Sequence, residues 1–187
     1  GARYPWESSV SGEEQCPNWQ YADHEIHVTA DVVHGIWHYY QAAGDIEFLK
    51  NALPVLKETA RYWLARVCRR PGGAVTLDGV MGPDEYICLC NNNAYTNFMA
   101  ARSLEITAWA LELCGEAAEP GFIEDLRETA QGLMNSVDWS GVIPQCDHFE
   151  DYEEPDFETM WPDRSKPFGG QVSQEYNYRV KALKQAD

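Results

Sequence analysis

Basic residues are scarce in this 187-residue sequence. It contains 14 Lys and Arg against 30 Asp and Glu, which gives a formal net charge of −16. Nucleic acids and anionic membrane surfaces are both bound through clustered cations, so this balance argues against nucleic-acid and membrane partners. Long apolar runs are missing as well. None approaches the roughly 20 residues of a membrane span, and no signal peptide opens the chain.

The rest of the composition is typical of a folded protein. Apolar residues make up 44% and aromatic residues 12%, with seven Trp, so the chain can build a hydrophobic core. The length suits a single domain, for which about 100–200 residues are common. A chain of this size needs no disulfide scaffold, and Cys88 and Cys90 lack the C-x-x-C spacing of zinc and redox sites. We therefore expect a soluble protein of a reducing cytoplasm, without a metal site.

Apolar residues recur at three- and four-residue steps along much of the chain, which is the period of an α-helix. The predicted helices cover residues 26–43, 46–51, 54–69, 94–113 and 122–137, and a last one begins near Tyr176. Pro54 is expected in the first turn of its helix, where a missing N–H is tolerated. Long loops are predicted over residues 1–25, 74–93 and 138–175, and no strand pattern competes. The predicted fold class is all-α.

A faint internal repeat links two of these helices. Residues 58–67 read ETARYWLARV, and residues 128–137 read ETAQGLMNSV. Each copy is predicted to form the second helix of a helix–turn–helix pair, and a long aromatic loop precedes each pair. This alternation is typical of α-solenoids and closed helical toroids, in which the long loops gather at one end and form the active site.

The most specific stretch is GVMGPDEY at 79–86, followed by NNNAYTN at 91–97. Gly and Pro fix a tight turn, and the Asn cluster is suited to cap the next helix. A carboxyl held in a rigid loop among aromatic residues can be desolvated, which raises its pKa and lets it act as an acid near neutral pH. The same residues also fit a surface turn whose acidic side chains are simply hydrated.

Four ordered motifs resemble those of glycoside hydrolase family 65, namely GARYPWES, EIH at 25–27, GVMGPDEY with NNNAYTN, and KQAD at 184–187. That family includes inverting phosphorylases of maltose, trehalose, kojibiose, nigerose and glucosylglycerol. The resemblance covers nearly the whole chain. It implies an (α/α)6 toroid with long active-site loops, of which residues 1–187 form a central fragment without the N-terminal β-rich domain and the C-terminal toroid helices. It also implies a single general acid, which falls on Glu85.

The mechanism implied by this resemblance follows from the nucleophile. An inverting hydrolase needs two carboxyl groups about 6.5–9.5 Å apart, one of them to activate water. A phosphorylase can dispense with the second, because phosphate is already an anionic nucleophile. Glu85 would protonate the glycosidic oxygen while phosphate attacks the anomeric carbon from the opposite face. The expected partners are an α-glucoside and inorganic phosphate as cosubstrate, with no cofactor, and a homodimer in the full-length protein.

The resemblance also implies a set of sugar-binding residues. Lys184 and Gln185 match the residues that hold glucose in the subsite of the transferred sugar, and Trp6 and Glu7 match further pocket residues. A loop anchor is the alternative role for Trp6, and a solvated helix position is the alternative for Lys184. The remaining predicted substrate-binding residues flank the acid or lie where the first loop meets its helix: His24, Glu25, His27, Asp84 and Tyr86.

Three histidines, His27, His34 and His38, lie within about 40° of one another on a helix of 100° per residue. This spacing could form a metal-binding face. We favour a polar stripe instead, because no carboxylate or thiol pattern completes a set of ligands.

One departure from the family pattern concerns the residues after the acid. Many members carry His-Glu after GPDEY, whereas this sequence has Ile87 and Cys88. Because a pocket that loses hydrogen-bonding groups changes the partner that it accepts, we expect an acceptor other than the reducing glucose of maltose.

Two other interpretations remain open. One is an inverting hydrolase of the same family, such as a trehalase-like enzyme, in which Glu7, Glu13 or Glu14 activates water. The other is a carbohydrate-binding fragment without its own activity, because a pocket with part of its wall missing cannot preorganise a substrate. On the second interpretation the isolated chain is inactive.

Overall fold

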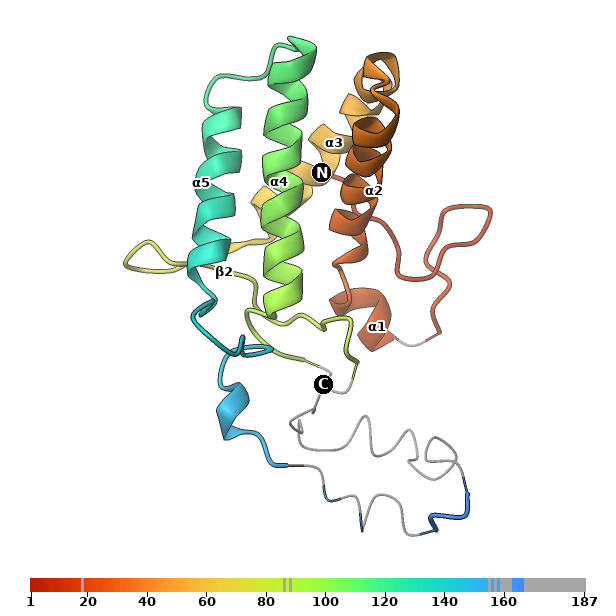
Figure 1. Cartoon of the computed structure of the whole chain (residues 1–187), viewed down its shortest axis with the longest axis vertical. Coiled ribbons are helices and arrows are strands. Elements are labelled where there is room, and N and C mark those ends of the chain that lie inside the picture. The colour runs from red at the N-terminus through yellow and green to blue at the C-terminus, as the bar shows by residue number, and fades with distance from the viewer. Residues whose placement is uncertain are drawn as a thin grey trace.

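The computed structural model describes residues 1–17, 19–85, 87, 89–154, 156, 158 and 163–166. Within them the chain forms a bundle of long α-helices with loops at one end (Figure 1). The helices are α1 (Trp19–His24), α2 (Val28–Ala43), α3 (Ile46–Arg66), α4 (Ala94–Cys114) and α5 (Phe122–Asn135), followed by a 3-10 turn at Phe149–Asp151. The helix predicted from Tyr176 lies outside the described residues. None of the described helices is long and apolar enough to cross a membrane.

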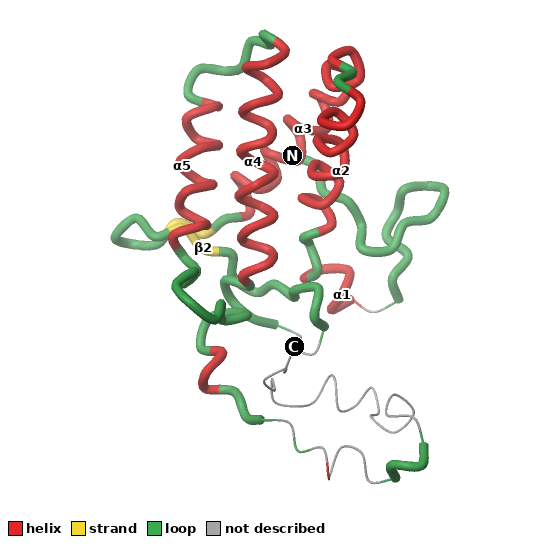
Figure 2. Tube along the Cα trace, in the orientation of Figure 1, coloured by secondary structure: helices red, strands yellow, loops and turns green. Residues whose placement is uncertain are grey.

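The four long helices form two antiparallel pairs. Gly44 ends α2 in the left-handed conformation with φ of 66°, and Asp45 begins α3 by accepting a hydrogen bond from the backbone N–H of Phe48 at 2.9 Å. Gly115 ends α4 in the same left-handed way before the chain turns into α5. As a result α2 and α4 both begin at the end of the bundle near α1, and Figure 2 shows that the loops preceding them meet there.

The predicted repeat coincides with equivalent buried positions on α3 and α5. Each copy lies on the second helix of its pair, as expected. Four positions in or just before the first copy correspond to four in or just before the second. All eight side chains are buried: Leu56 and Leu126, Thr59 and Thr129, Ala60 and Ala130, Trp63 and Leu133. Between them α4 packs against α2, α3 and α5 and is buried on most sides.

The prediction of two separate helices at 46–51 and 54–69 is wrong, because α3 runs without a break through Pro54. The buried side chains of Leu49, Leu53 and Leu56 continue one apolar stripe across the proline, and their burial favours a continuous helix. Pro54 itself is exposed, so the carbonyl that it leaves unpaired can be hydrated.

Two further elements differ from the sequence prediction. Helix α1 occupies part of the segment predicted as a loop, and a hairpin of β1 (Cys68–Arg69) and β2 (Val75–Thr76) pairs antiparallel where no strand was expected. Each strand is two residues long, which is too short to produce an alternating pattern in the sequence.

Candidate active site

The loop that carries Glu85 is tied to its surroundings by backbone hydrogen bonds. We call residues 79–85 the acid loop. Val80 exchanges two hydrogen bonds of 2.9 Å with Cys90, which closes the loop at its base. The backbone N–H of Met81 donates to the carbonyl of His24, and Nδ1 of His24 donates to the carbonyl of Gly79, both at 2.9 Å. The acid loop is therefore fixed to the end of α1.

Three consecutive asparagines hold the other side of this loop. Asn91 Oδ1 accepts from the N–H of Gly79 at 2.9 Å, and Asn92 Oδ1 accepts from the N–H of Leu77 at 3.1 Å. Asn93 caps α4 by accepting from the N–H of Thr96 at 3.0 Å, as the sequence predicts.

Gly82 packs directly against this cap. A Cβ atom at Gly82 would lie only 2.3 Å from Nδ2 of Asn93, so the loop needs glycine there. The cap of α4 and the path of the acid loop are therefore coupled.

Glu85 lies half-buried beside two other carboxyl groups. Burial raises the pKa of Glu85, and the negative charges of Glu25 and Asp84 raise it further. Asp84 is itself oriented by Gln145, whose Nε2 donates to Oδ2 at 2.8 Å. A carboxyl group in such surroundings retains its proton to higher pH than a hydrated one, which suits it to donate a proton.

Glu25 is buried, with 2% of its surface exposed, and its neighbour His27 is buried as well. Nε2 of His27 lies 3.4 Å from Oε1 of Glu25, and Nδ1 lies 2.8 Å from Oδ2 of Asp31. Burial alone would lower the pKa of His27, but the hydrogen bonds and charges of Asp31 and Glu25 outweigh it and raise the pKa to about 9. The imidazole is therefore a cation at neutral pH.

The pKa of Glu25 is subject to opposing influences. Burial raises it, and the hydrogen bond and the charge of His27 lower it only in part, so the pKa of Glu25 stays above its usual value. The second carboxylate oxygen of Glu25, Oε2, is buried and has no hydrogen-bond partner among the residues that the structure describes. An acceptor atom in this position can bind a sugar hydroxyl.

Trp6 contacts the same histidine. Its ring centroid lies 5.7 Å from that of His27, and the rings meet edge to face. The backbone around Trp6 is held by Glu14, whose carboxylate accepts from the N–H groups of Trp6, Glu7 and Cys16 at 2.7–3.0 Å. Burial raises the pKa of Glu14, but these backbone hydrogen bonds outweigh it and lower the pKa. Both carboxylate oxygens of Glu14 are thus used by the loop.

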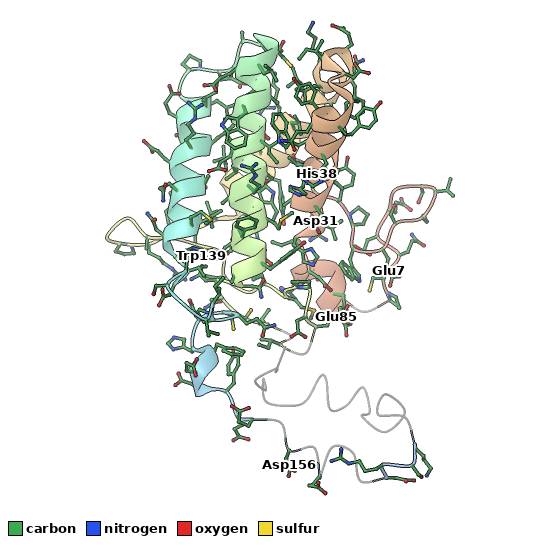
Figure 3. All side chains as sticks on the ribbon, in the orientation of Figure 1. Glu7, Asp31, His38, Glu85, Trp139 and Asp156 are labelled. Atoms are coloured by element: carbon green, nitrogen blue, oxygen red, sulfur yellow. The ribbon has the colours of Figure 1, made fainter. Side chains whose placement is uncertain are left out.

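The predicted site residues therefore fall into three groups. His24, Glu25, His27, Asp84 and Glu85 come together at the start of α2 and on the acid loop, with Trp6 against His27. Glu7 is exposed on the N-terminal loop (Figure 3). Three predicted residues lie outside the described part of the chain: Tyr86, Lys184 and Gln185.

The three histidines do not converge on one point. His27 lies between two carboxylates, whereas the rings of His34 and His38 contact each other with centroids 4.0 Å apart. Within the residues described here, no three His, Cys, Asp or Glu side chains are arranged to hold a metal ion.

Asp31 and Tyr95 belong to this cluster but were not predicted. Asp31 lies four residues after His27, on the same helical face, and that spacing could have identified it. Tyr95 donates from its hydroxyl to Oδ1 of Asp31 at 3.2 Å. Nothing in the sequence pattern pairs these two residues, because they meet only through the packing of α4 against α2.

Comparison with known proteins places this arrangement in a family. Residues 1–187 match the Glycosyl hydrolase family 65 central catalytic domain. The chain is 31% identical to a kojibiose phosphorylase of Halothermothrix orenii over 100% of its own length and 28% of that protein. It is 40% identical to a kojibiose hydrolase of Flavobacterium johnsoniae over 81% of the chain and 22% of that protein. The chain thus spans about a quarter of the length of these relatives.

A solved structure shares the fold. It is a human-microbiome protein described as a candidate kojibiose phosphorylase, 26% identical, with a TM-score of 0.78 over 96% of this chain and 26% of that one. The prediction of an all-α fold, with the helical pairs forming part of a toroid, is thereby confirmed. By its sequence and its fold, the chain belongs to glycosyl hydrolase family 65.

Proposed function

We propose that the protein carrying this chain is an inverting α-glucoside phosphorylase, with Glu85 as its general acid and inorganic phosphate as its nucleophile. The observation that carries this proposal is the placement of Glu85, half-buried on a fixed loop beside Glu25 and Asp84, which raises its pKa. The match to phosphorylases of the same family supports the reaction class. Residues 1–187 would then form the central part of the catalytic toroid.

In this reaction the bond between the anomeric carbon and the glycosidic oxygen breaks. Glu85 transfers its proton to that oxygen, which leaves as the hydroxyl of the acceptor. A phosphate oxygen attacks the anomeric carbon from the opposite face, so an α-glucoside yields β-glucose 1-phosphate. Glu85 is left as a carboxylate and regains a proton from solvent before the next turnover.

The transferred glucose is proposed to lie between the acid loop and the N-terminal loop. Oε2 of Glu25 is available there as an acceptor for a hydroxyl group, and the ring of Trp6 can form an apolar platform beside His27. By resemblance to the family, Lys184, Gln185 and Tyr86 complete the sugar site, while His24, Asp84 and Glu7 support it.

The proposed acceptor differs from that of maltose phosphorylases. Ile87, which stands where many relatives have His, is buried in the hydrophobic core and offers no hydrogen bond. Because relatives are named as kojibiose phosphorylases, kojibiose is a suitable first substrate to assay. Synthesis from β-glucose 1-phosphate and a panel of glucose, glycerol and other acceptors tests this. A product other than maltose is expected, and clean formation of maltose would contradict it.

Hydrolysis is the second candidate, because a kojibiose hydrolase is among the relatives. The two reactions differ in their products. We expect the intact protein to release β-glucose 1-phosphate only when phosphate is present, which ³¹P NMR detects directly. Release of β-glucose at the same rate with and without phosphate would instead assign the protein as an inverting hydrolase.

A further inference from the structure

Asp31 connects two elements that meet at the candidate site. It lies one turn into α2, and its carboxylate is shared between that helix and α4. Oδ2 lies 2.8 Å from Nδ1 of His27, and Oδ1 accepts the hydroxyl of Tyr95 at 3.2 Å. Asp31 lies in none of the motifs that define the family resemblance, and it does not neighbour Glu85 in sequence.

The contacts form a continuous series from α4 to Glu25, and the carbonyl of His24, the preceding residue, accepts from the N–H of Met81 in the acid loop. Tyr95 contacts Asp31, Asp31 contacts His27, and Nε2 of His27 lies 3.4 Å from Oε1 of Glu25. Both ring nitrogens of His27 therefore face carboxylate oxygens. Only the doubly protonated imidazolium can donate a hydrogen bond to each of them.

Glu25 is the group through which this series reaches Glu85. Its side chain is buried, so without a cation beside it the carboxylate would be strongly disfavoured. When Glu25 is ionised, its negative charge acts on Glu85. An anion close to a carboxylic acid opposes loss of the proton from that acid.

We propose that Asp31 is a positioning residue for the general acid: it holds His27 as a cation, so that Glu25 remains an anion beside Glu85 and Glu85 keeps its proton. This inference rests on the proposed role of Glu85. It adds to that role a reason why the charge of one carboxyl group strengthens the hold of its neighbour on a proton.

The charges around the cluster agree with this assignment. His27 is faced by Glu25 and Asp31, and its ring also meets the edges of Trp6 and Tyr95. Asp31 is further approached by His34 on its own helix. Glu85 is approached by Glu25 and by Asp84. The raised pKa of His27, about 9, keeps the cation in place throughout the neutral range.

Replacing Asp31 by Asn reverses each step. Without the carboxylate, burial lowers the pKa of His27, and the imidazole becomes neutral at lower pH. Glu25 then loses its cation and binds a proton more readily. Glu85, next to a neutral Glu25, loses its proton at lower pH. The alkaline limb of the pH–rate profile, which reports the acid group, is therefore expected to move to lower pH by about one unit.

The test is the pH dependence of kcat/KM for phosphorolysis by the intact protein. Asp31→Asn is compared with Asp23→Asn, which removes the charge of an exposed aspartate just before His24 and should leave the limb unmoved. Asp31→Glu, which keeps the charge, should restore much of the wild-type profile. A lower rate at every pH with an unmoved limb would mean that Asp31 is merely structural, and it would overturn the proposal.

Two further variants keep the test decisive. If Asp31→Asn does not fold, His27→Gln must shift the limb in the same direction, because Asp31 acts through His27; an unmoved limb refutes the proposal. Glu25→Gln should also lower the limb, and adding Asp31→Asn to it should produce no further shift. A further shift in the double variant would contradict the route through Glu25.

The same experiment separates this inference from the proposed function. If Glu85→Gln retains wild-type activity, the assignment of the acid fails and the limb cannot report it. If Glu85→Gln is inactive but the limb of Asp31→Asn is unmoved, the acid stands and only the role of Asp31 fails.

Discussion

Three carboxyl groups, those of Glu25, Asp84 and Glu85, lie at the candidate site, and their surroundings differ. Asp84 is oriented by the amide of Gln145, and Glu25 lies beside the cation of His27. Glu85 is subject to burial and to the charges of the other two. Neighbouring acids in different environments can take different roles at one pH: Glu25 has the cation of His27 beside it, whereas the charges of Glu25 and Asp84 favour the protonated form of Glu85.

The charge on His27 also has a consequence for stability. Its pKa is about 9 in the folded protein against an ordinary value of 6.5, so the folded state binds the proton more tightly than the unfolded chain. The stabilisation is complete below pH 6.5 and is lost as pH rises through 9. Its size is about 3 kcal/mol from the difference in pKa.

We therefore predict that the unfolding free energy of His27→Gln changes less with pH than that of the wild type. The difference in unfolding free energy between the wild type and the variant should be largest near pH 6.5 and should shrink by up to about 3 kcal/mol by pH 9. Denaturant titrations at several pH values measure it. A difference that stays constant over this range would show that His27 is not charged as described.

The sequence can predict those parts of the site whose residues lie close together along the chain. Glu85 and its neighbours lie in one motif, and His24, Glu25 and His27 in another, so patterns in the sequence identify both. The contact of Asp31 with Tyr95 joins α2 to α4 and has no counterpart in the sequence. Likewise, no sequence pattern indicates that Glu14 holds the N-terminal loop, because its partners there are three backbone N–H groups.

At the scale of the elements, long periodic helices were the most predictable part of the fold. The bounds of α4 and α5 fall close to those expected, because Asn93 caps α4 and Gly115 ends it, while α5 begins directly after Gly121 and has one apolar face. The sequence predicts a division of α3 near Pro54, because a proline inside a helix removes a hydrogen bond, whereas in the protein burial of the apolar stripe outweighs that loss. The strands β1 and β2 carry no periodic signal at two residues each.

The contact of the acid loop with the start of α4 can be tested by Gly82→Ala. The new methyl group would meet the side chain of Asn93, so either the helix cap or the loop must move. We expect a loss of stability of about 1–3 kcal/mol and a marked loss of activity. Thermal unfolding and kcat measured on the same preparation check both effects.

Gly35→Ala is the matched control for this variant. Gly35 lies on α2, and apart from its chain neighbours and the backbone of its own helix turn, no atom of the described residues is within 4 Å of a Cβ built there. Helix propensity should make this change neutral or stabilising by up to about 1 kcal/mol. Equal losses in the two variants would contradict the idea that the contact of Gly82 with Asn93 is what matters.

At the scale of the whole molecule, the net charge of −16 poses a question for an enzyme that binds phosphate. Near the start of α2 and the acid loop, His27 is already engaged by two carboxylates, and Arg3 and Arg66 donate to the backbone carbonyls of Ala22 and Gly79. Because the chain spans about a quarter of the length of its relatives, the phosphate site can be completed by residues outside residues 1–187. The proposed activity is accordingly that of the intact protein.

The most direct test of the account compares two substrates of the Glu85→Gln variant of the intact protein. Cleavage of a disaccharide needs a proton on the leaving oxygen, whereas α-glucosyl fluoride releases fluoride without one. With phosphate present, the variant should lose about 10²–10⁴-fold in rate on the disaccharide but stay within about tenfold of the wild type on the fluoride. Equal losses on both substrates, or full activity on the disaccharide, would show that Glu85 is not the general acid.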